Sequence, residues 1–169
     1  MTVDYSVDAI YEIRKHLWEE LKSNKLFKAS DYYIENSGTE IIPIIPVQQQ
    51  PELNQFLSGK SHIVYDKTGL SYEENWMICC EKILFTIYST DVSEINSIRN
   101  LMIDVFRRMD LSAKDLNASK GTNKIIFFNT MVMEITPTEP SMELDGFLST
   151  DVILEVKYAR VTDRLGRFE

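Results

Sequence analysis

Apolar residues recur every three or four positions in two parts of the chain, the spacing typical of amphipathic helices. In residues 6–23 the repeating positions are Ile10, Ile13, Leu17 and Leu21. Ser6 precedes them as a candidate N-cap. A longer repeat fills residues 92–109. Asp91, just before it, and Glu94, in its first turn, have the spacing of a capping box. The pattern therefore predicts one helix near the start of the chain and another in its middle.

Three other segments alternate between apolar and polar residues, the period of a half-buried strand. The clearest is residues 76–88, in which one face would carry Glu81, Ile83, Phe85 and Ile87. Residues 124–136 and 147–161 form a second and a third strand pattern on either side of a loop. The Asp145-Gly146 pair in that loop favours a reversal of the chain. These last two strands are expected to form a closing two-strand unit.

Shorter elements fill the first half of the chain. Residues 31–35 and the apolar run 40–47 predict a hairpin, and Pro43 and Pro46 confine that run to a sheet edge because proline donates no backbone hydrogen bond. The prolines either blunt the edge against aggregation or leave it for a neighbouring subunit to complete. A short helix is predicted over residues 51–57, then a strand over 62–65.

The residues that follow this strand, 66–69, read Asp-Lys-Thr-Gly and predict a turn. In order, the elements are helix, short hairpin, strand, long strand, helix and two long strands. This order predicts an α+β fold, a mainly antiparallel sheet with two principal helices packed mostly on one face. A chain of 169 residues with 44% hydrophobic content can bury one sizeable core. We therefore expect a single domain over residues 1–161, followed by a tail, 162–169, that is flexible or ordered by a partner.

The net charge of the chain narrows the range of possible functions. The formal net charge is -8 and the pI is near 4.9. A protein that grips nucleic acid needs clustered Lys and Arg to neutralise phosphates, so this class is disfavoured. The chain starts without a basic segment followed by an apolar run, and no window approaches the roughly eighteen apolar residues that span a bilayer. We expect a soluble, cytosolic protein.

The imbalance of charge is concentrated in one stretch, residues 125–156, which contains neither Lys nor Arg. Its six acidic residues are Glu134, Glu139, Glu143, Asp145, Asp151 and Glu155. They are spread over a predicted hairpin rather than gathered at the spacing of metal ligands. The sequence thus predicts one strongly acidic element.

No catalytic, metal-binding or cofactor-binding pattern accompanies these acids. Cys79 and Cys80 are adjacent, so they lack the spacing of zinc or redox motifs and are expected to be free thiols. The Gly-Lys-Ser of residues 59–61 resembles a phosphate loop, but Asn54 stands where that motif requires glycine. On a strand, His62 and Asp66 would lie about 13 Å apart, too far for a base and its orienting acid. We do not expect an enzyme.

The order of elements carries a family resemblance, together with one Pro- and Gln-rich segment, Ile44-Ile45-Pro46-Val47-Gln48-Gln49-Gln50-Pro51-Glu52. The chain resembles the tail-terminator or tail-completion proteins of long-tailed bacteriophages, particularly contractile-tailed, T4-like phages. The resemblance implies a virion protein, assembled in the host cytoplasm, that forms a hexameric ring. Such a ring caps the tail tube, the sheath or both and offers a surface to the neck protein, while DNA passes through without specific binding.

Within such a ring, apolar strand edges are the expected subunit contacts, and the candidates are Ile41, Ile42, Ile44, Ile45, Ile63 and Tyr65. Acidic side chains expected to face the lumen or the tail tube are Glu134, Glu139, Glu143 and Asp145. An acidic hairpin also serves simply as a solvated surface that promotes solubility. Both explanations are open at the level of sequence.

Two other functions stay open. The protein could be a head–tail connector or neck protein of the same assembly, because those layers share related folds. It could also be a non-viral α+β module that binds a small ligand on a sheet face free of helices. The mass of the protein in solution separates a ring from a monomeric binding module.

Overall fold

The structure is a computed structural model, and it describes residues 7–34, 39–53, 56–72, 78–107 and 110–160. The helices are α1 (Ala9–Ser23), α2 (Gln50–Leu53), α3 (Val92–Phe106) and α4 (Asp110–Ser119), with 3-10 turns at Ala29–Tyr32 and Val47–Gln49. The strands are β1 (Tyr33–Ile34), β2 (Thr39–Glu40), β3 (Ile44–Pro46), β4 (His62–Tyr72), β5 (Cys79–Ser89), β6 (Ile125–Ile135), β7 (Glu139–Pro140) and β8 (Leu148–Arg160).

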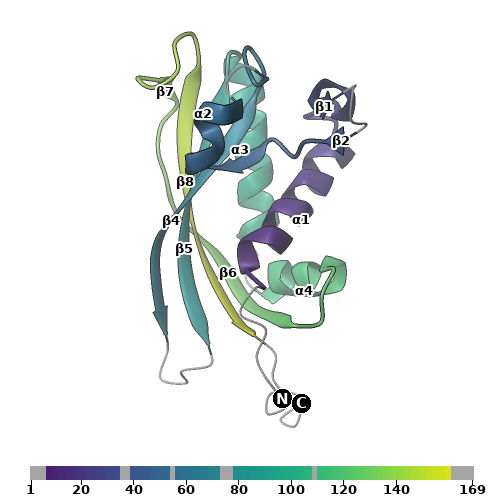
Figure 1. The fold of residues 1–169 in the computed structure, drawn as a ribbon. Helices are drawn as coiled ribbons and strands as arrows, with labels where there is room; N and C mark the ends of the chain where they lie inside the picture. Colours follow the sequence, from purple (N-terminus) through teal and green to yellow (C-terminus); the bar gives the residue numbers. More distant parts are fainter. Residues whose placement is uncertain (1–6, 35–38, 54–55, 73–77, 108–109, 161–169) are drawn as a thin grey trace.

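The fold is α+β, built on one mixed sheet of six strands (Figure 1). The strand order is β3-β4-β5-β8-β6, and the short β7 pairs with the start of β8. Neighbours are antiparallel except β3 and β4, which run parallel. A separate two-stranded sheet joins β1 and β2. The long strands β4, β5, β6 and β8 form the frame on which everything else is placed.

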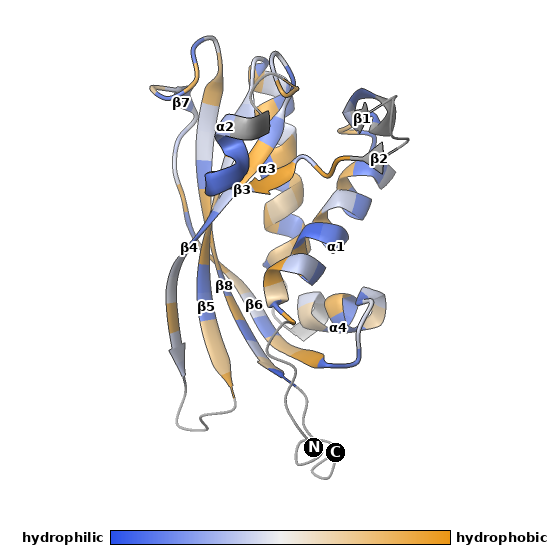
Figure 2. Ribbon diagram, viewed as in Figure 1, coloured by the Kyte–Doolittle hydropathy of each residue, from blue (hydrophilic) through white to orange (hydrophobic). Residues whose placement is uncertain are grey.

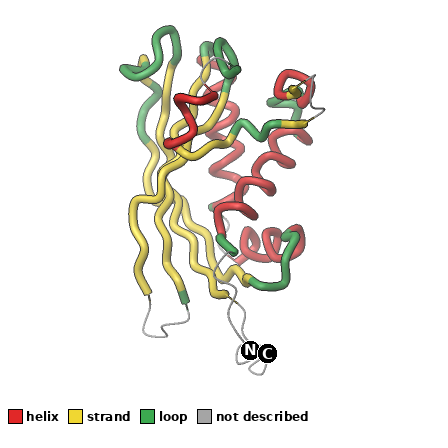
Figure 3. Tube along the Cα trace, viewed as in Figure 1, coloured by secondary structure: helices red, strands yellow, loops and turns green. Residues whose placement is uncertain are grey.

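Helices α1, α3 and α4 lie on one side of this sheet (Figures 1 and 3). The predicted stripe of α1 is buried, as are the α3 positions Ile95, Ile98, Met102 and Phe106. They form one core with the helix-facing side chains of the sheet. On β5 that face carries Ile83, Phe85 and Ile87, all fully buried, as the alternation predicts. Figure 2 shows β3 and much of α3 as hydrophobic. The helix layer is held to the sheet by burial of apolar surface.

Both long helices form where the apolar period predicts them, with differences at their starts. Helix α1 begins at Ala9, and the predicted cap Ser6 lies outside the described residues. Asp8 takes the cap position, but its side chain does not cap the helix. At α3, Asp91 accepts a hydrogen bond from the backbone of Ser93. Glu94 accepts one from the hydroxyl of Ser89 (3.3 Å) instead of returning to Asp91, so only half of the capping box is formed.

The predicted turn at residues 66–69 is wrong, because β4 continues through it to Tyr72. The register of β4 against β5 shifts between Lys67 and Gly69, which marks a β-bulge at Thr68. Strand β5 is long enough to pair with the whole of β4, so the ladder absorbs one extra residue as a bulge instead of ending. Residues typical of turns therefore lie inside an edge strand.

The predicted hairpin is confirmed only in part. β1 and β2 pair as expected, with Tyr33 opposite Glu40. The apolar run that follows does not extend this hairpin: β3 turns away and pairs in parallel with β4. It is an edge strand, as its prolines predict, and the carbonyl of Pro43 accepts a hydrogen bond from Ile63 (2.8 Å). The short helix predicted over residues 51–57 corresponds to α2, which is described from Gln50 to Leu53; residues 54–55 lie outside the described part of the chain.

Helix α4 occupies ten residues between α3 and β6. Its Asn117 donates to the carbonyl of Phe127 and accepts from the amide of the same residue, each at 2.9 Å. The predicted tail, residues 162–169, lies outside the described part of the chain. Among the described helices, none is long and apolar enough to cross a membrane.

Candidate functional site

Within the acidic stretch, residues 125–156, a structured loop over residues 136–147 connects β6 to β8 and includes β7. These residues, 136–147, are called the acidic loop below. Its conformation is held by the Ser141 hydroxyl, which accepts from the backbone N–H groups of Glu143 (3.2 Å) and Leu144 (3.1 Å). The amide of Ser141 donates to the carbonyl of Phe147 at 2.8 Å. Gly146 adopts a φ of 81°, a left-handed conformation that favours glycine. The loop is therefore built by its own hydrogen bonds, at the β7 end of the sheet in Figure 1.

The acidic residues proposed for the lumen, namely Glu134, Glu139, Glu143 and Asp145, are all exposed. Glu143 also accepts a hydrogen bond from the hydroxyl of Tyr88 (3.2 Å). Burial and the neighbouring Glu143 raise the pKa of Tyr88 to about 12. The other acids of the segment lie on the sheet, where Asp151 accepts from Thr86 at 2.8 Å and Glu155 is half-buried. The exposed acids thus form a surface that remains hydrated.

This arrangement is not a metal centre in the described part of the chain, where no three His, Cys, Asp or Glu side chains gather to hold an ion. The cysteines are free thiols, Cys79 buried and Cys80 half-buried. Burial raises the pKa of each thiol, which disfavours the reactive thiolate.

The Gly-Lys-Ser segment does not form a phosphate loop. The ammonium group of Lys60 donates to the carbonyl of Asp31 (2.7 Å), and the buried Ser61 hydroxyl donates to Ser89 (3.0 Å). These polar groups serve contacts within the fold, where no nucleotide is needed to satisfy them.

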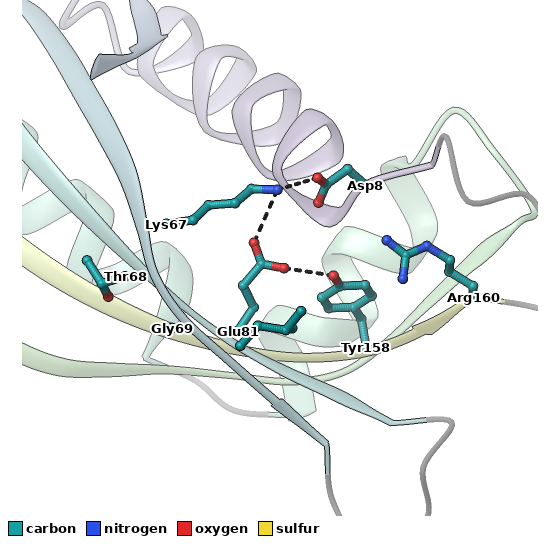
Figure 4. A pocket seen from close by; sticks show the side chains of 8 residues that line it. Asp8, Lys67, Thr68, Gly69, Glu81, Tyr158 and Arg160 are labelled. Carbon is teal, nitrogen blue, oxygen red and sulfur yellow. Dashed lines mark hydrogen bonds and ion pairs between the residues drawn. The ribbon is translucent and has the colours of Figure 1, made fainter. Parts of the chain in front are cut away.

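A charged hollow lies where β4, β5 and β8 pass the start of α1 (Figure 4). Its volume is about 370 Å³, and it is lined by Asp8, Lys67, Thr68, Gly69, Leu70, Glu81, Tyr158 and Arg160. At its base is the carboxylate of Glu81, only 3% exposed. The Tyr158 hydroxyl donates to Glu81 Oε2 at 2.7 Å, and the ammonium nitrogen of Lys67 lies 3.4 Å from Glu81 Oε1. Lys67 also forms an ion pair with Asp8.

In this cluster of Asp8, Lys67, Glu81 and Tyr158, the neighbouring groups set the ionisation states of Lys67 and Tyr158. Burial by itself would lower the pKa of Lys67, but the hydrogen bond to Asp8 and the charges of Glu81 and Asp8 outweigh it and raise that pKa. Burial and the bond to Glu81 raise the pKa of Tyr158. Lys67 therefore stays protonated and Tyr158 neutral through the ordinary pH range. The cluster fastens β4 to the start of α1.

Sequence reasoning missed this cluster, although one signal was present. Glu81 is the single charged residue on the otherwise apolar face of the best-predicted strand. A carboxylate there must find a donor, because an unpaired buried charge is costly. Its partners are Lys67 on β4 and Tyr158 on β8, and only the fold brings these segments together.

The structure places four of the six proposed subunit contacts inside the molecule. Ile44, Ile45 and Ile63 are at most 1% exposed, and Tyr65 is 8% exposed. Their side chains fill the core because β3 lies under the helix layer, where Arg14 of α1 donates to the carbonyl of Ile44 (2.6 Å). This corrects the expectation that these side chains are available to a second subunit. Ile41 and Ile42 are half-buried.

Replacing Ile44 with Ala is therefore expected to destabilise the monomer fold itself, by about 2–5 kcal/mol, because it leaves a cavity in a closed core. Urea denaturation followed by circular dichroism measures the loss. The matched control is Val47→Ala, at a side chain that is 37% exposed, where a change within about 0.5 kcal/mol is expected. Equal stability of the two variants would contradict this placement.

His62 is a structural histidine rather than a catalytic base. It is 2% exposed and stacks on Tyr88, with ring centroids 5.1 Å apart. The edge of Phe147 covers it at 5.6 Å. Its Nδ1 lies 2.9 Å from the carbonyl of Lys60, so this nitrogen donates and carries the proton of the neutral ring. Asp66, which the sequence analysis places too far away to orient His62, is exposed.

Burial lowers the pKa of His62 from 6.5, and the Lys60 carbonyl only partly offsets this. The unfolded chain therefore binds a proton more readily than the folded one, so stability is full above pH 6.5 and falls as the pH decreases below it. His62→Phe keeps the ring stacking and is expected to flatten this fall between about pH 7 and 5. Burial also lowers the pKa of His16, so His16→Gln should flatten the fall as well, and the two changes together should flatten it most. Thermal melting across that range tests this, and an unchanged slope in His62→Phe would contradict the assignment.

Three strand edges of the described sheet lack a neighbouring strand. The first is the outer side of β3, whose Ile44 and Ile45 side chains are buried and whose Ile44 carbonyl accepts from Arg14. Two edges remain besides it. One is the outer side of β6, the last strand in the order. The other is residues 66–72 of β4, because β3 covers β4 only from Ile63 to Tyr65. All seven residues of that second edge are exposed, including Leu70 (57%) and Tyr72 (58%). On β6, exposed apolar side chains are Phe128 (41%), Met133 (45%) and Ile135 (41%). Free apolar edges of this kind are sites of strand addition.

No protein-family model matches the chain, and no curated protein sequence matches it either. The function must therefore be argued from the edges, the acidic loop and the charged hollow. In the hollow, Lys67 is paired with both Asp8 and Glu81, and Arg160 donates to the carbonyl of Val7.

Proposed function

We propose that the chain is a structural subunit of a long-tailed bacteriophage that forms a ring, a hexamer as in tail-terminator proteins, and caps the tail. The observation that carries the proposal is the presence of two free strand edges on opposite sides of one sheet. An identical copy can dock at each edge, and a repeated head-to-tail contact closes into a ring when the rotation between copies fits. The role is assembly rather than catalysis, and it needs no cofactor.

The acidic loop supports the proposal that the ring surrounds DNA. Its exposed carboxylates Glu139, Glu143 and Asp145 would repel phosphates, as would Glu134 on β6. We place this loop on the lumen or on the tube-facing side of the ring, so that DNA passes without being held. A structure of the assembly with the loop on the outer rim would contradict this placement.

The sheet face opposite the helix layer supports the proposal because it offers a surface for contact with other tail proteins. Its central side chains are half-buried and mixed in character, among them Leu84, Thr86, Ile153 and Glu155. In a tail terminator the partners on either side of the ring are the tail tube or sheath protein and the neck protein. A ring one layer higher would be a neck connector, which is the alternative.

Two measurements test the function. Light scattering should give a mass near six chains, and a monomer at micromolar concentration would overturn the ring. Electron microscopy of tails assembled without this protein should show tubes of uncontrolled length. Normal tails that fail to join heads would instead assign the connector role.

A further inference from the structure

The two free edges run in directions that fit one another. From β4 through β5 and β8 to β6 each neighbouring pair is antiparallel. β6 therefore runs opposite to β4, and β6 of one copy can lie beside β4 of the next as one more antiparallel pair. The sheet would continue from copy to copy with the same side always facing the helices.

We propose that β6 of one copy pairs with residues 66–72 of β4 in the next, with Val132 opposite Leu70. The proposal rests on the ring of the proposed function and names its contact. Both edges are free over similar lengths, because β3 covers the first part of β4 and Asn117 occupies the backbone groups of Phe127. What remains open is residues 128–135 on one side and 66–72 on the other.

The register follows from the faces of the two strands. Leu70 lies opposite Glu81 and Tyr72 opposite Cys79, both on the helix side of the sheet. On β6, Val132 lies opposite Leu154 and therefore faces the same side. Pairing Val132 with Leu70 also sets Thr130 against Tyr72. A slip of one residue would move every side chain to the wrong face.

Charge supports the same register. Lys82 lies opposite Gly69, is exposed, and stands on the sheet side away from the helices. Gly69 has no side chain, and nothing lies within 4 Å of where one would begin, so the ammonium group of Lys82 can reach past the edge. Glu134 is exposed on the same side, opposite Ile153. In the proposed register Glu134 falls opposite Thr68, beside Gly69, so Lys82 of one copy meets Glu134 of the other.

The free part of β4 is its second half, and the free part of β6 is also its second half, at the opposite end of the sheet. Neighbouring copies are thus staggered along the strand direction. Strands tilted to the axis of a closed sheet accommodate a stagger of this kind. The contact is heterologous, which means that each copy uses a different edge toward each neighbour.

Cysteine cross-linking tests the contact. The proposed register sets Ser71 opposite Met131, both on the side away from the helices. Ser71→Cys and Met131→Cys are combined with Cys80→Ser, because Cys80 lies opposite Ser71 and would compete within the chain. Mild oxidation should give a ladder of linked copies up to the full ring on a non-reducing gel. Each single cysteine variant should give none, and melting temperatures check that every variant is folded.

Each outcome decides a different point. A linked dimer from either single variant would mean a two-fold contact and overturn the proposal. An intact ring by mass without a ladder would overturn this contact while leaving the proposed function in place. A monomeric wild-type protein would overturn both. Exchanging the charges supplies a second readout: Lys82→Glu and Glu134→Lys should each shift the mass toward monomer, and the two together should restore the ring.

Discussion

Replacing Lys67 with Met is expected to lower the free energy of unfolding by roughly 3 kcal/mol. Removing one partner of a buried ion pair typically costs about 3–5 kcal/mol, because the remaining charge is buried without compensation. The lower end applies here, since the Lys67 side chain is 40% exposed and water can partly replace it. The variant leaves the carboxylates of Glu81 and Asp8 facing one another. Urea denaturation at neutral pH measures the loss.

The matched control is Lys114→Met on α4, an exposed lysine, where a change within about 0.5 kcal/mol is expected. A combined variant, Lys67→Met with Glu81→Leu and Tyr158→Phe, removes the lysine together with the two buried polar groups, Glu81 and Tyr158. It should recover most of the lost stability, because apolar replacement of a whole buried pair is often neutral. A combined loss as large as the separate losses added would show that the cluster stabilises by more than mutual charge compensation.

Exchanging Glu139, Glu143 and Asp145 for Lys is expected to convert a ring that leaves DNA unbound into one that binds it. Each exchange changes the charge by two, so the three take the formal charge from -8 to -2 per chain. A ring multiplies this local change by the number of its subunits. Binding should weaken steeply between about 50 and 200 mM salt, because it depends on counterion release.

Comparing linear with circular DNA distinguishes a loop in the lumen of the ring from a loop on its outer rim. Lysines inside the ring can meet only a duplex that threads it, so the variant should bind a linear duplex and not a closed circle. Equal binding of both would place the loop outside the ring. The control carries the same exchanges at exposed acids of the helix layer, namely Glu19, Asp104 and Asp115. It should bind linear and circular DNA alike.

The proposed contact changes which residues matter for assembly. At the level of sequence, the apolar run 40–47 was the more attractive edge, yet Ile44 and Ile45 lie in the core. The more exposed edge includes Leu70 and Tyr72, in a part of β4 that follows the predicted turn at residues 66–69. A bulge interrupts the apolar-polar alternation of a strand. A strand with turn residues at its bulge is therefore not predicted from its sequence pattern.

Much of the local structure was predictable from the amino-acid pattern. Helices α1 and α3 and strands β5, β6 and β8 form where their periods indicate, because burying an apolar face of the right period is a local requirement. The buried face of β5 and the edge position of β3 followed in the same way, from alternation and from proline. The acidic character of the loop before β8 is likewise a property of the sequence alone.

The tertiary structure decided everything that depends on distant segments meeting. It paired β3 in parallel with β4, carried β4 through a predicted turn and joined Asp8, Lys67 and Tyr158 around the buried carboxylate of Glu81. These contacts join residues far apart in the chain, and their energy comes from burial and charge pairing that no local window contains. The sequence by itself determined the elements and their polarity; the packing of the sheet determined which edges stayed free and which charges were paired.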